Sequence, residues 1–330
     1  MPPVSPPPLP DPWSVTDPFG EVLHELRMTG TLYCRSDLSA PWGLTLPPVP
    51  GCLMVHAVTA GHALLTVDGH APLRLGPGDL ALVPHGEGHA LTSGPGAAAP
   101  SFFALPRREL TPRYELLRHG GGGEPTAMAC AVVRCDRPAA AFLIRALPRV
   151  LHVPAQGLEA EDAEAALAAE WVRSTLRLMD AEARALRPGG ETVMTRLADV
   201  LVVQAVRVWL ATDPAAQRGW LGALRDAHVG PALAAIHREP GRAWTVEALA
   251  DTAALSRSAF AERFAALVGE PPFRYLTRWR MALAPTLLAE EGLTVGEAAD
   301  RLGYGSETAF SRAFHRVHGV PPGSVSRDRP

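Results

Sequence analysis

Four side chains that commonly bind metal ions are spread along the first half of the chain: Cys34, His56, His89 and Cys130. Each lies in or just after a short apolar run of the kind that forms a β-strand. Strands of a barrel point alternate side chains inward, so one ligand from each of four strands can meet at one point. Two thiolates and two imidazoles make a tetrahedral zinc set. The sequence therefore suggests a zinc site, and the alternative is an apolar barrel with incidental polar groups.

Two further cysteines bear on this hypothesis. Cys52 precedes His56 by four residues and would share its strand face, so it is a substitute ligand. Cys135 follows Cys130 by an odd number of residues and would point to the opposite side. Oxidation of a thiolate ligand would release the ion, so an oxidant is a candidate effector alongside a metal.

A repeat near the C-terminus carries a different kind of chemistry. Seven residues recur at an offset of 50 positions, and these are Ser256, Ala259, Phe260, Phe264, Gly269, Pro271 and Pro272, matched by Ser306, Ala309, Phe310, Phe314, Gly319, Pro321 and Pro322. Each unit is expected to form a short helix, a tight turn and a second helix, at 295–302 and 307–318 in the second unit. Gly303 supplies the left-handed turn residue and Ser306 the N-cap. The first unit has Ala254 where the second has Gly303, at a cost of about 1 kcal/mol for a left-handed alanine.

The two phenylalanines of each unit lie four residues apart and must face a core, which turns the other side of each helix outward. A helix–turn–helix of this size places the start of its second helix in the major groove of DNA. The outward residues of the two second helices, which are the predicted DNA-binding residues, are Arg257, Ser258, Ala261, Glu262, Glu307, Thr308, Ser311, Arg312 and Arg316.

The elements that position these residues fall into distinct regions of a multidomain α+β chain. Residues 1–18 are Pro-rich and predict a disordered lead, and residues 19–154 carry short apolar runs between turn signals, typical of a β-barrel or jelly roll. Residues 155–225 predict a helical hairpin linker, and residues 226–330 an all-α domain with two helix–turn–helix motifs.

The hairpin is expected to support the domains or to form a homodimer. In its first helix, Trp171, Thr175, Leu178 and Met179 recur at helical spacing and predict one shared face. The second helix is apolar over more than one face, which favours dimerisation over a purely supporting role.

Composition excludes several classes of protein. The chain has 330 residues with 31 basic and 34 acidic side chains, and every basic one is Arg. The sequence has no stretch of about 18 uncharged apolar residues, so no membrane span is predicted. The N-terminus lacks the Arg and apolar run of a secretory signal, and four cysteines do not make a disulfide scaffold. A cytoplasmic location is expected.

The C-terminal motifs resemble a known family. The segments 298–304, 306–314 and 319–322 are similar to the signature of AraC/XylS-type transcriptional regulators, and 244–250 with 256–260 resembles that family's first helix–turn–helix. The resemblance covers roughly the last hundred residues. It implies sequence-specific binding to double-stranded DNA through the outward residues named above, with RNA polymerase as a further partner.

The first region resembles a cupin. Gly78 to His89 is similar to the second cupin motif, and His56 with Gly61 resembles a reduced first motif. The resemblance implies a small jelly-roll barrel that senses a small molecule, metal or oxidant, with His56 and His89 at cupin metal positions. The alternative is a metal-dependent cupin enzyme, against which the first motif lacks the usual Glu and second His.

Charge in the C-terminal region is nearly balanced. Residues 241–330 hold 11 Arg and 10 Asp or Glu, a net charge of +1. Arg274, Arg278 and Arg280 on the connecting helix are expected to lie on one side together with Arg312 and Arg316. We therefore expect weak non-specific affinity for DNA and a strong dependence on the right site.

Overall fold

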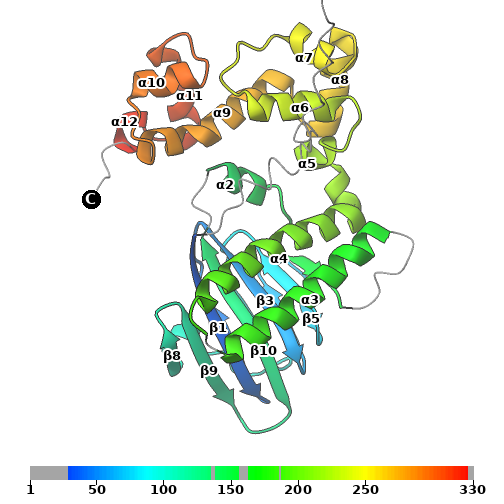
Figure 1. The fold of residues 1–330 in the computed structure, drawn as a ribbon, viewed down its shortest axis with the longest axis vertical. Helices are drawn as coiled ribbons and strands as arrows, with labels where there is room; N and C mark the ends of the chain where they lie inside the picture. Colours follow the sequence, from blue (N-terminus) through cyan, green and yellow to red (C-terminus); the bar gives the residue numbers. More distant parts are fainter. Residues whose placement is uncertain (1–28, 135–137, 156–162, 186, 326–330) are drawn as a thin grey trace, which may run out of the picture.

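The computed structural model describes residues 29–134, 138–155, 163–185 and 187–325. Residues 1–18, predicted to be disordered, and Cys135 lie outside the described residues. The described chain forms a two-sheet β domain, a helical hairpin packed on it and a helical C-terminal part, which confirms the predicted fold class (Figure 1).

Two β-sheets enclose the core of the first domain. The larger sheet has the strand order β11-β6-β3-β10-β1-β9-β8, and the smaller has the order β2-β7-β4-β5. The strands of the larger sheet are β1 (Thr29–Ser39), β3 (Cys52–Ala60), β6 (Leu80–Val83), β8 (Arg107–Thr111), β9 (Tyr114–Gly120), β10 (Pro125–Arg134) and β11 (Leu151–Val153). Those of the smaller sheet are β2 (Gly43–Leu46), β4 (Ala63–Val67), β5 (Leu73–Leu75) and β7 (His89–Thr92). A short 3-10 helix, η1 (Phe102–Ala104), follows β7.

The central strand β3 is buried on both of its faces. Met54 and Val58 point into the core between the two sheets, and Leu53, Val55 and Ala57 point the other way. Helices cover that other face of the larger sheet, so neither side of the strand meets water. This explains why residues 52–58, apart from His56, are apolar instead of alternating with polar residues.

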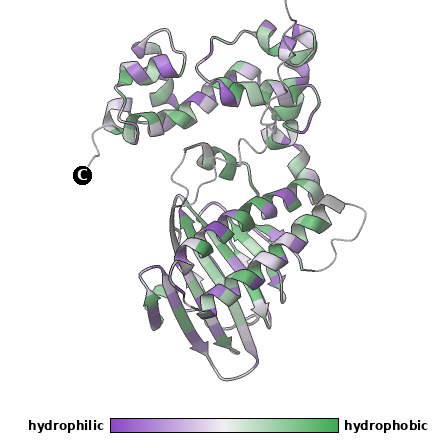
Figure 2. Ribbon diagram, viewed as in Figure 1, coloured by the Kyte–Doolittle hydropathy of each residue, from purple (hydrophilic) through white to green (hydrophobic). Residues whose placement is uncertain are grey.

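The hairpin consists of α3 (Ala163–Ala185) and α4 (Gly190–Thr212), which lie along the outer face of the larger sheet (Figure 1). Figure 2 shows hydrophobic residues recurring along both helices and along the central strands that they cover. The predicted shared face of α3 is wrong: Thr175 and Met179 are buried, whereas Trp171 and Leu178 are exposed. No helix in the described ranges is long and apolar enough to cross a bilayer.

The C-terminal part contains the two predicted helix–turn–helix units. Its elements are η2 (Pro214–Gln217), α5 (Gly219–Ala223), α6 (Val229–Arg238), α7 (Val246–Thr252), α8 (Arg257–Val268), α9 (Pro272–Ala289), α10 (Val295–Arg301), α11 (Glu307–His318) and α12 (Pro322–Val325). Helix α9 contacts both units and joins them.

The β domain reaches the C-terminal part through α2 (Pro138–Ile144), which packs against α9. The ring of Phe142 lies 5.2 Å from Trp220, 5.7 Å from Tyr275 and 5.2 Å from Trp279, centroid to centroid. The guanidinium of Arg278 lies over the Phe142 ring, 4.6 Å from its centroid. One aromatic side chain of the β domain is thereby held by the helix that connects the two units.

Candidate nucleic-acid interface and barrel site

The second helices of the two units have equivalent N-terminal and C-terminal caps. The Ser256 hydroxyl accepts a hydrogen bond from the Ala259 backbone N–H at 3.3 Å, and Ser306 accepts one from Ala309 at 3.2 Å. Both second helices end at a left-handed glycine, Gly269 in the first and Gly319 in the second. The structure thus confirms the predicted start and stop signals in both units.

The tight turns also match the prediction. Ala254 has a φ of 52° and Gly303 a φ of 68°, so both occupy the left-handed region. Ala254 is the only non-glycine residue with positive φ in the described ranges. Its conformation is fixed by the requirement that α7 turn sharply into α8.

Buried aromatic pairs orient the second helix of each unit. Phe260 and Phe264 in α8, and Phe310 and Phe314 in α11, are fully buried. The opposite face of each helix is therefore free for a ligand. The predicted DNA-binding residues are all exposed or half-buried there: Arg257, Ser258, Ala261, Glu262, Glu307, Thr308, Ser311, Arg312 and Arg316.

These exposed arginines are not equivalent. Arg257 forms an ion pair with Glu247 of α7, with an N–O distance of 2.7 Å. Arg312 and Arg316 form no ion pair within the described part of the chain. Both guanidinium groups on α11 are therefore available to phosphates or to the acceptor edge of guanine.

The connecting helix does not present its arginines as predicted. Arg280 donates hydrogen bonds to the carbonyl oxygens of Pro240 at 2.7 Å and Arg242 at 2.9 Å. A third, at 3.3 Å, reaches the carbonyl of Gly303 in the second turn. Arg280 is therefore a structural clamp, and Arg278 faces the β domain and Glu270, at 2.7 Å. Arg274 is exposed beside Glu270.

In the β domain, three of the four predicted metal ligands lie in one row across the larger sheet. Cys34 on β1 is paired in register with Cys130 on β10, which is paired with His56 on β3. His89 comes from β7 of the opposite sheet. The Nδ1 of His56 lies 3.3 Å from the Cys130 Sγ, and its Nε2 lies 2.7 Å from the Nε2 of His89. Cys52, the substitute ligand, is buried at the start of β3, in register with Arg134.

Burial keeps this cluster uncharged. It raises the pKa of Cys34 to about 11, and raises that of Cys130 further. It also lowers the pKa of His56, with a smaller contribution from the neighbouring His89, and lowers that of His89 itself. The thiols are therefore protonated and the imidazoles neutral near pH 7.

The arrangement does not fit a single tetrahedral zinc ion. Cys130 lies near the Nδ1 of His56 and His89 near its Nε2, so one ion cannot be bound by all three in these side-chain positions. Two nitrogen ligands of a tetrahedral ion would also stand about 3.3 Å apart, farther than the 2.7 Å hydrogen bond between the histidines. Among the residues that the structure describes, no three His, Cys, Asp or Glu side chains are grouped to hold a metal.

Two helix–turn–helix units with exposed second helices, attached to a two-sheet barrel, define a DNA-binding transcriptional regulator with a cupin domain. Family comparison agrees: a cupin model matches residues 17–211, and a helix-turn-helix domain model matches residues 249–328. The chain belongs to the AraC-type transcriptional regulators and is not an enzyme. The cupin match extends through α3 and into the last turn of α4.

Relatives match over nearly their whole length. An AraC-like transcription regulator of Streptomyces lividans is 35% identical over 94% of this chain and 98% of its own. The transcriptional regulator AlkR of Acinetobacter baylyi is 28% identical over 91% of this chain and 95% of its own. Among solved structures, the DNA-binding domain of AdpA in complex with a target DNA is 30% identical over 31% of this chain and 91% of its own, with a TM-score of 0.30.

Proposed function

We propose that the protein reads a short duplex site by placing α8 and α11 in successive segments of the major groove. One observation carries the proposal: the two units repeat the same cap, turn and stop, and each exposes the face opposite its two buried phenylalanines. The contacts would come from the nine predicted DNA-binding residues, with Arg312 suited to guanine and Glu262 and Glu307 to cytosine.

Selection of binding sites from random duplex DNA tests this proposal. The purified full chain should enrich one motif with two conserved blocks about one helical turn apart. Because the net charge of the C-terminal region is close to zero, competitor DNA of unrelated sequence should remove little of the protein from its selected site. Enrichment of no motif would reject the proposal.

The barrel is proposed as the sensing domain, with the cluster of His56, His89 and Cys130 as its polar interior group. His56 and Cys130 of this cluster border a small cavity, which Cys34, Ser36 and mainly apolar side chains such as Leu44, Leu91 and Phe102 also line. A small molecule, a metal or an oxidant that enters this cavity would meet the neutral imidazole of His56 and the protonated thiols of Cys34 and Cys130. Regulation would pass to the DNA-binding part through α2 and through α4.

Zinc binding by Cys34, His56, His89 and Cys130 stays a prediction, since the present side-chain positions would have to change. Metal analysis of protein purified without air tests it, with Cys34→Ser and Cys130→Ser as comparisons. One equivalent of zinc in the wild type, absent from both variants, would support the site. Wild-type protein without stoichiometric metal would reject the zinc prediction.

We further propose a homodimer that works in the cytoplasm, with RNA polymerase as partner if the protein is an activator. Most apolar residues of α4, including Met194, Leu201 and Val202, are buried and are not available for dimerisation. The supporting surface is instead on α3, where Leu167, Trp171 and Leu178 are each more than half exposed and recur at helical spacing. We call these three residues the α3 stripe.

A further inference from the structure

A groove lies between the outer face of the larger sheet and the hairpin α3–α4, on the side of the sheet opposite the barrel interior. Its floor is made of small side chains: Ala129 of β10 is paired in register with Ala57 of β3, and Ala131 follows two residues later. The space between sheet and hairpin amounts to about 570 Å³, including the part open to solvent.

The roof of the groove is apolar and adaptable. Leu176 and Met179 of α3 and Met194 and Leu201 of α4 line it. Methionine side chains are unbranched and can repack around ligands of different shape. The walls therefore suit apolar ligands and can adapt to ligands of different shapes.

One polar group inside the groove lacks a partner. Tyr114 of β9 is 6% exposed, and its hydroxyl makes no hydrogen bond to any residue that the structure describes. Burial raises the pKa of this phenol to about 12, so it keeps its proton and can donate. A buried hydroxyl without a partner is unfavourable, and a ligand with a hydrogen-bond acceptor would satisfy it.

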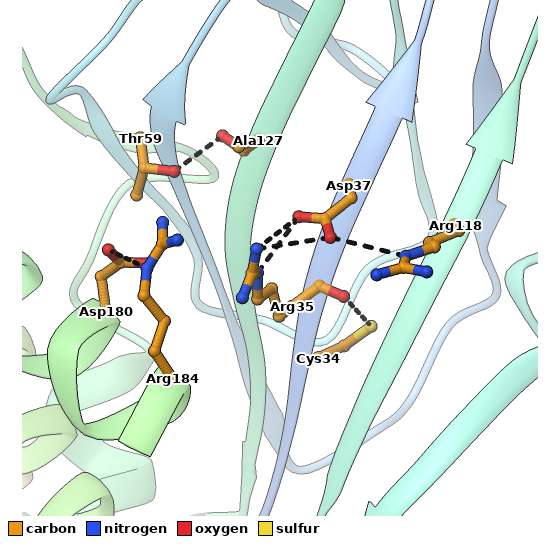
Figure 3. Close-up of polar contacts among 8 residues, drawn as sticks. All are labelled: Cys34, Arg35, Asp37, Thr59, Arg118, Ala127, Asp180 and Arg184. Atoms are coloured by element: carbon orange, nitrogen blue, oxygen red, sulfur yellow. Dashed lines mark hydrogen bonds and ion pairs between the residues drawn. The ribbon is translucent and has the colours of Figure 1, made fainter. Parts of the chain in front are cut away.

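The charges at the edge of the groove are already paired. Figure 3 shows Arg35 beside Asp37 on β1, and Asp180 beside Arg184 on α3. The closest N–O distances are 3.1 Å in the first pair and 2.9 Å in the second. An anionic or cationic ligand would have to displace one of these partners, whereas a neutral ligand would not.

We propose that this groove binds a neutral, mainly apolar small molecule that carries one hydrogen-bond acceptor, such as a carbonyl oxygen, and that Tyr114 donates to it. The inference rests on the proposed sensing role but places the effector outside the barrel. Occupation of the groove would move the hairpin relative to the sheet, and α4 leads through η2 and α5 to the DNA-binding part.

Two naphthalenes of similar size test the role of Tyr114. Displacement of the neutral fluorescent probe N-phenyl-1-naphthylamine gives the affinity of the full chain for 2-acetylnaphthalene and for 2-ethylnaphthalene, which lacks the acceptor. We expect the acetyl compound to bind at least fivefold more tightly. Tyr114→Phe should bring the two affinities within twofold by weakening only the acetyl compound, and Tyr304→Phe, in the C-terminal part, should keep the wild-type ratio. Equal affinities in the wild type would overturn the proposal.

A second pair of variants locates the site. Ala129 points into the groove and Val132, three residues further along β10, borders the barrel cavity. Ala129→Val should weaken probe binding at least tenfold, and Val132→Ile should leave it unchanged. The opposite pattern would place the ligand in the barrel and overturn the proposal. Binding of the selected DNA site by the same proteins is measured in parallel. Loss of ligand binding in the groove and loss of the proposed DNA recognition are therefore separate results.

Discussion

At the scale of single residues, the positions governed by local rules were predictable. Ser256, Ser306 and Gly303 satisfy needs that arise within a few residues of the chain, namely a helix cap and a left-handed turn. Arg280 was not predictable, because the carbonyls that it binds belong to Pro240, Arg242 and Gly303. Only the tertiary fold brings these groups together.

Arg312 is the residue where specificity should be most visible. Its guanidinium is exposed on α11 and free of ion pairs within the described chain. Arg312→Ala should lower the affinity for the selected site by about 1–3 kcal/mol and relax the preference at one base position. Binding isotherms on the site and on its single-base variants measure both effects, with Arg113→Ala on the β domain as the control. Unchanged preference at every position would mean that Arg312 contacts only phosphate or solvent.

At the scale of elements, apolar runs between turn signals predicted the β domain, and helical spacing predicted the hairpin and the paired units, whereas the short helix α2 was not predicted. Which side of α3 meets the sheet was not predictable, since Trp171 and Thr175 differ by little in helical angle. The boundary between buried and exposed residues passes between them. Sequence spacing shows which residues share a face, but the neighbouring sheet decides which face is covered.

The two turns offer a matched pair of substitutions. Ala254→Gly should raise the free energy of unfolding by up to about 1 kcal/mol, because it relieves a left-handed alanine. Gly303→Ala should lower it by more than that, since the added Cβ would also collide with the carbonyl oxygen of Gly241. Chemical denaturation of both variants and the wild type measures the difference. A stabilising Gly303→Ala would contradict this account of the turns.

The α3 stripe predicts the oligomeric state. Leu178→Glu places a charge on its exposed apolar surface and should shift the proposed dimer toward monomer, whereas Leu167→Met should not. Sedimentation velocity over a range of concentrations measures the equilibrium. A wild-type protein that stays monomeric at every concentration would remove the stripe as a dimer contact.

At the scale of the whole molecule, the β domain and the DNA-binding part share one apolar core. The core continues from the larger sheet through the hairpin to α8 and α9. His237 is half-buried and packs against this core, with its Nε2 2.7 Å from the Tyr275 hydroxyl and its ring 4.3 Å from Trp279. The two parts of the chain should therefore respond together to anything that disturbs this region.

Acid should weaken this shared core. Burial lowers the pKa of His237 to about 3, whereas in the unfolded chain it is near 6.5. The unfolded state then binds more protons, so stability falls as the pH drops below about 6.5 toward 3. Between pH 7 and pH 5 the loss should be on the order of 2 kcal/mol. Thermal unfolding of wild type and His237→Gln over this range checks it, and equal pH slopes would assign the loss to other groups.

The most direct test of the account is a hydroxyl-radical footprint of the full chain on its selected DNA site. If α8 and α11 read successive major-groove segments, each protein chain should protect two patches about 10 base pairs apart on one face of the duplex. Substitution in α8, Arg257→Ala, should weaken one patch, and Arg312→Ala in α11 should weaken the other. A single patch for each chain, or protection that does not depend on sequence, would contradict the account.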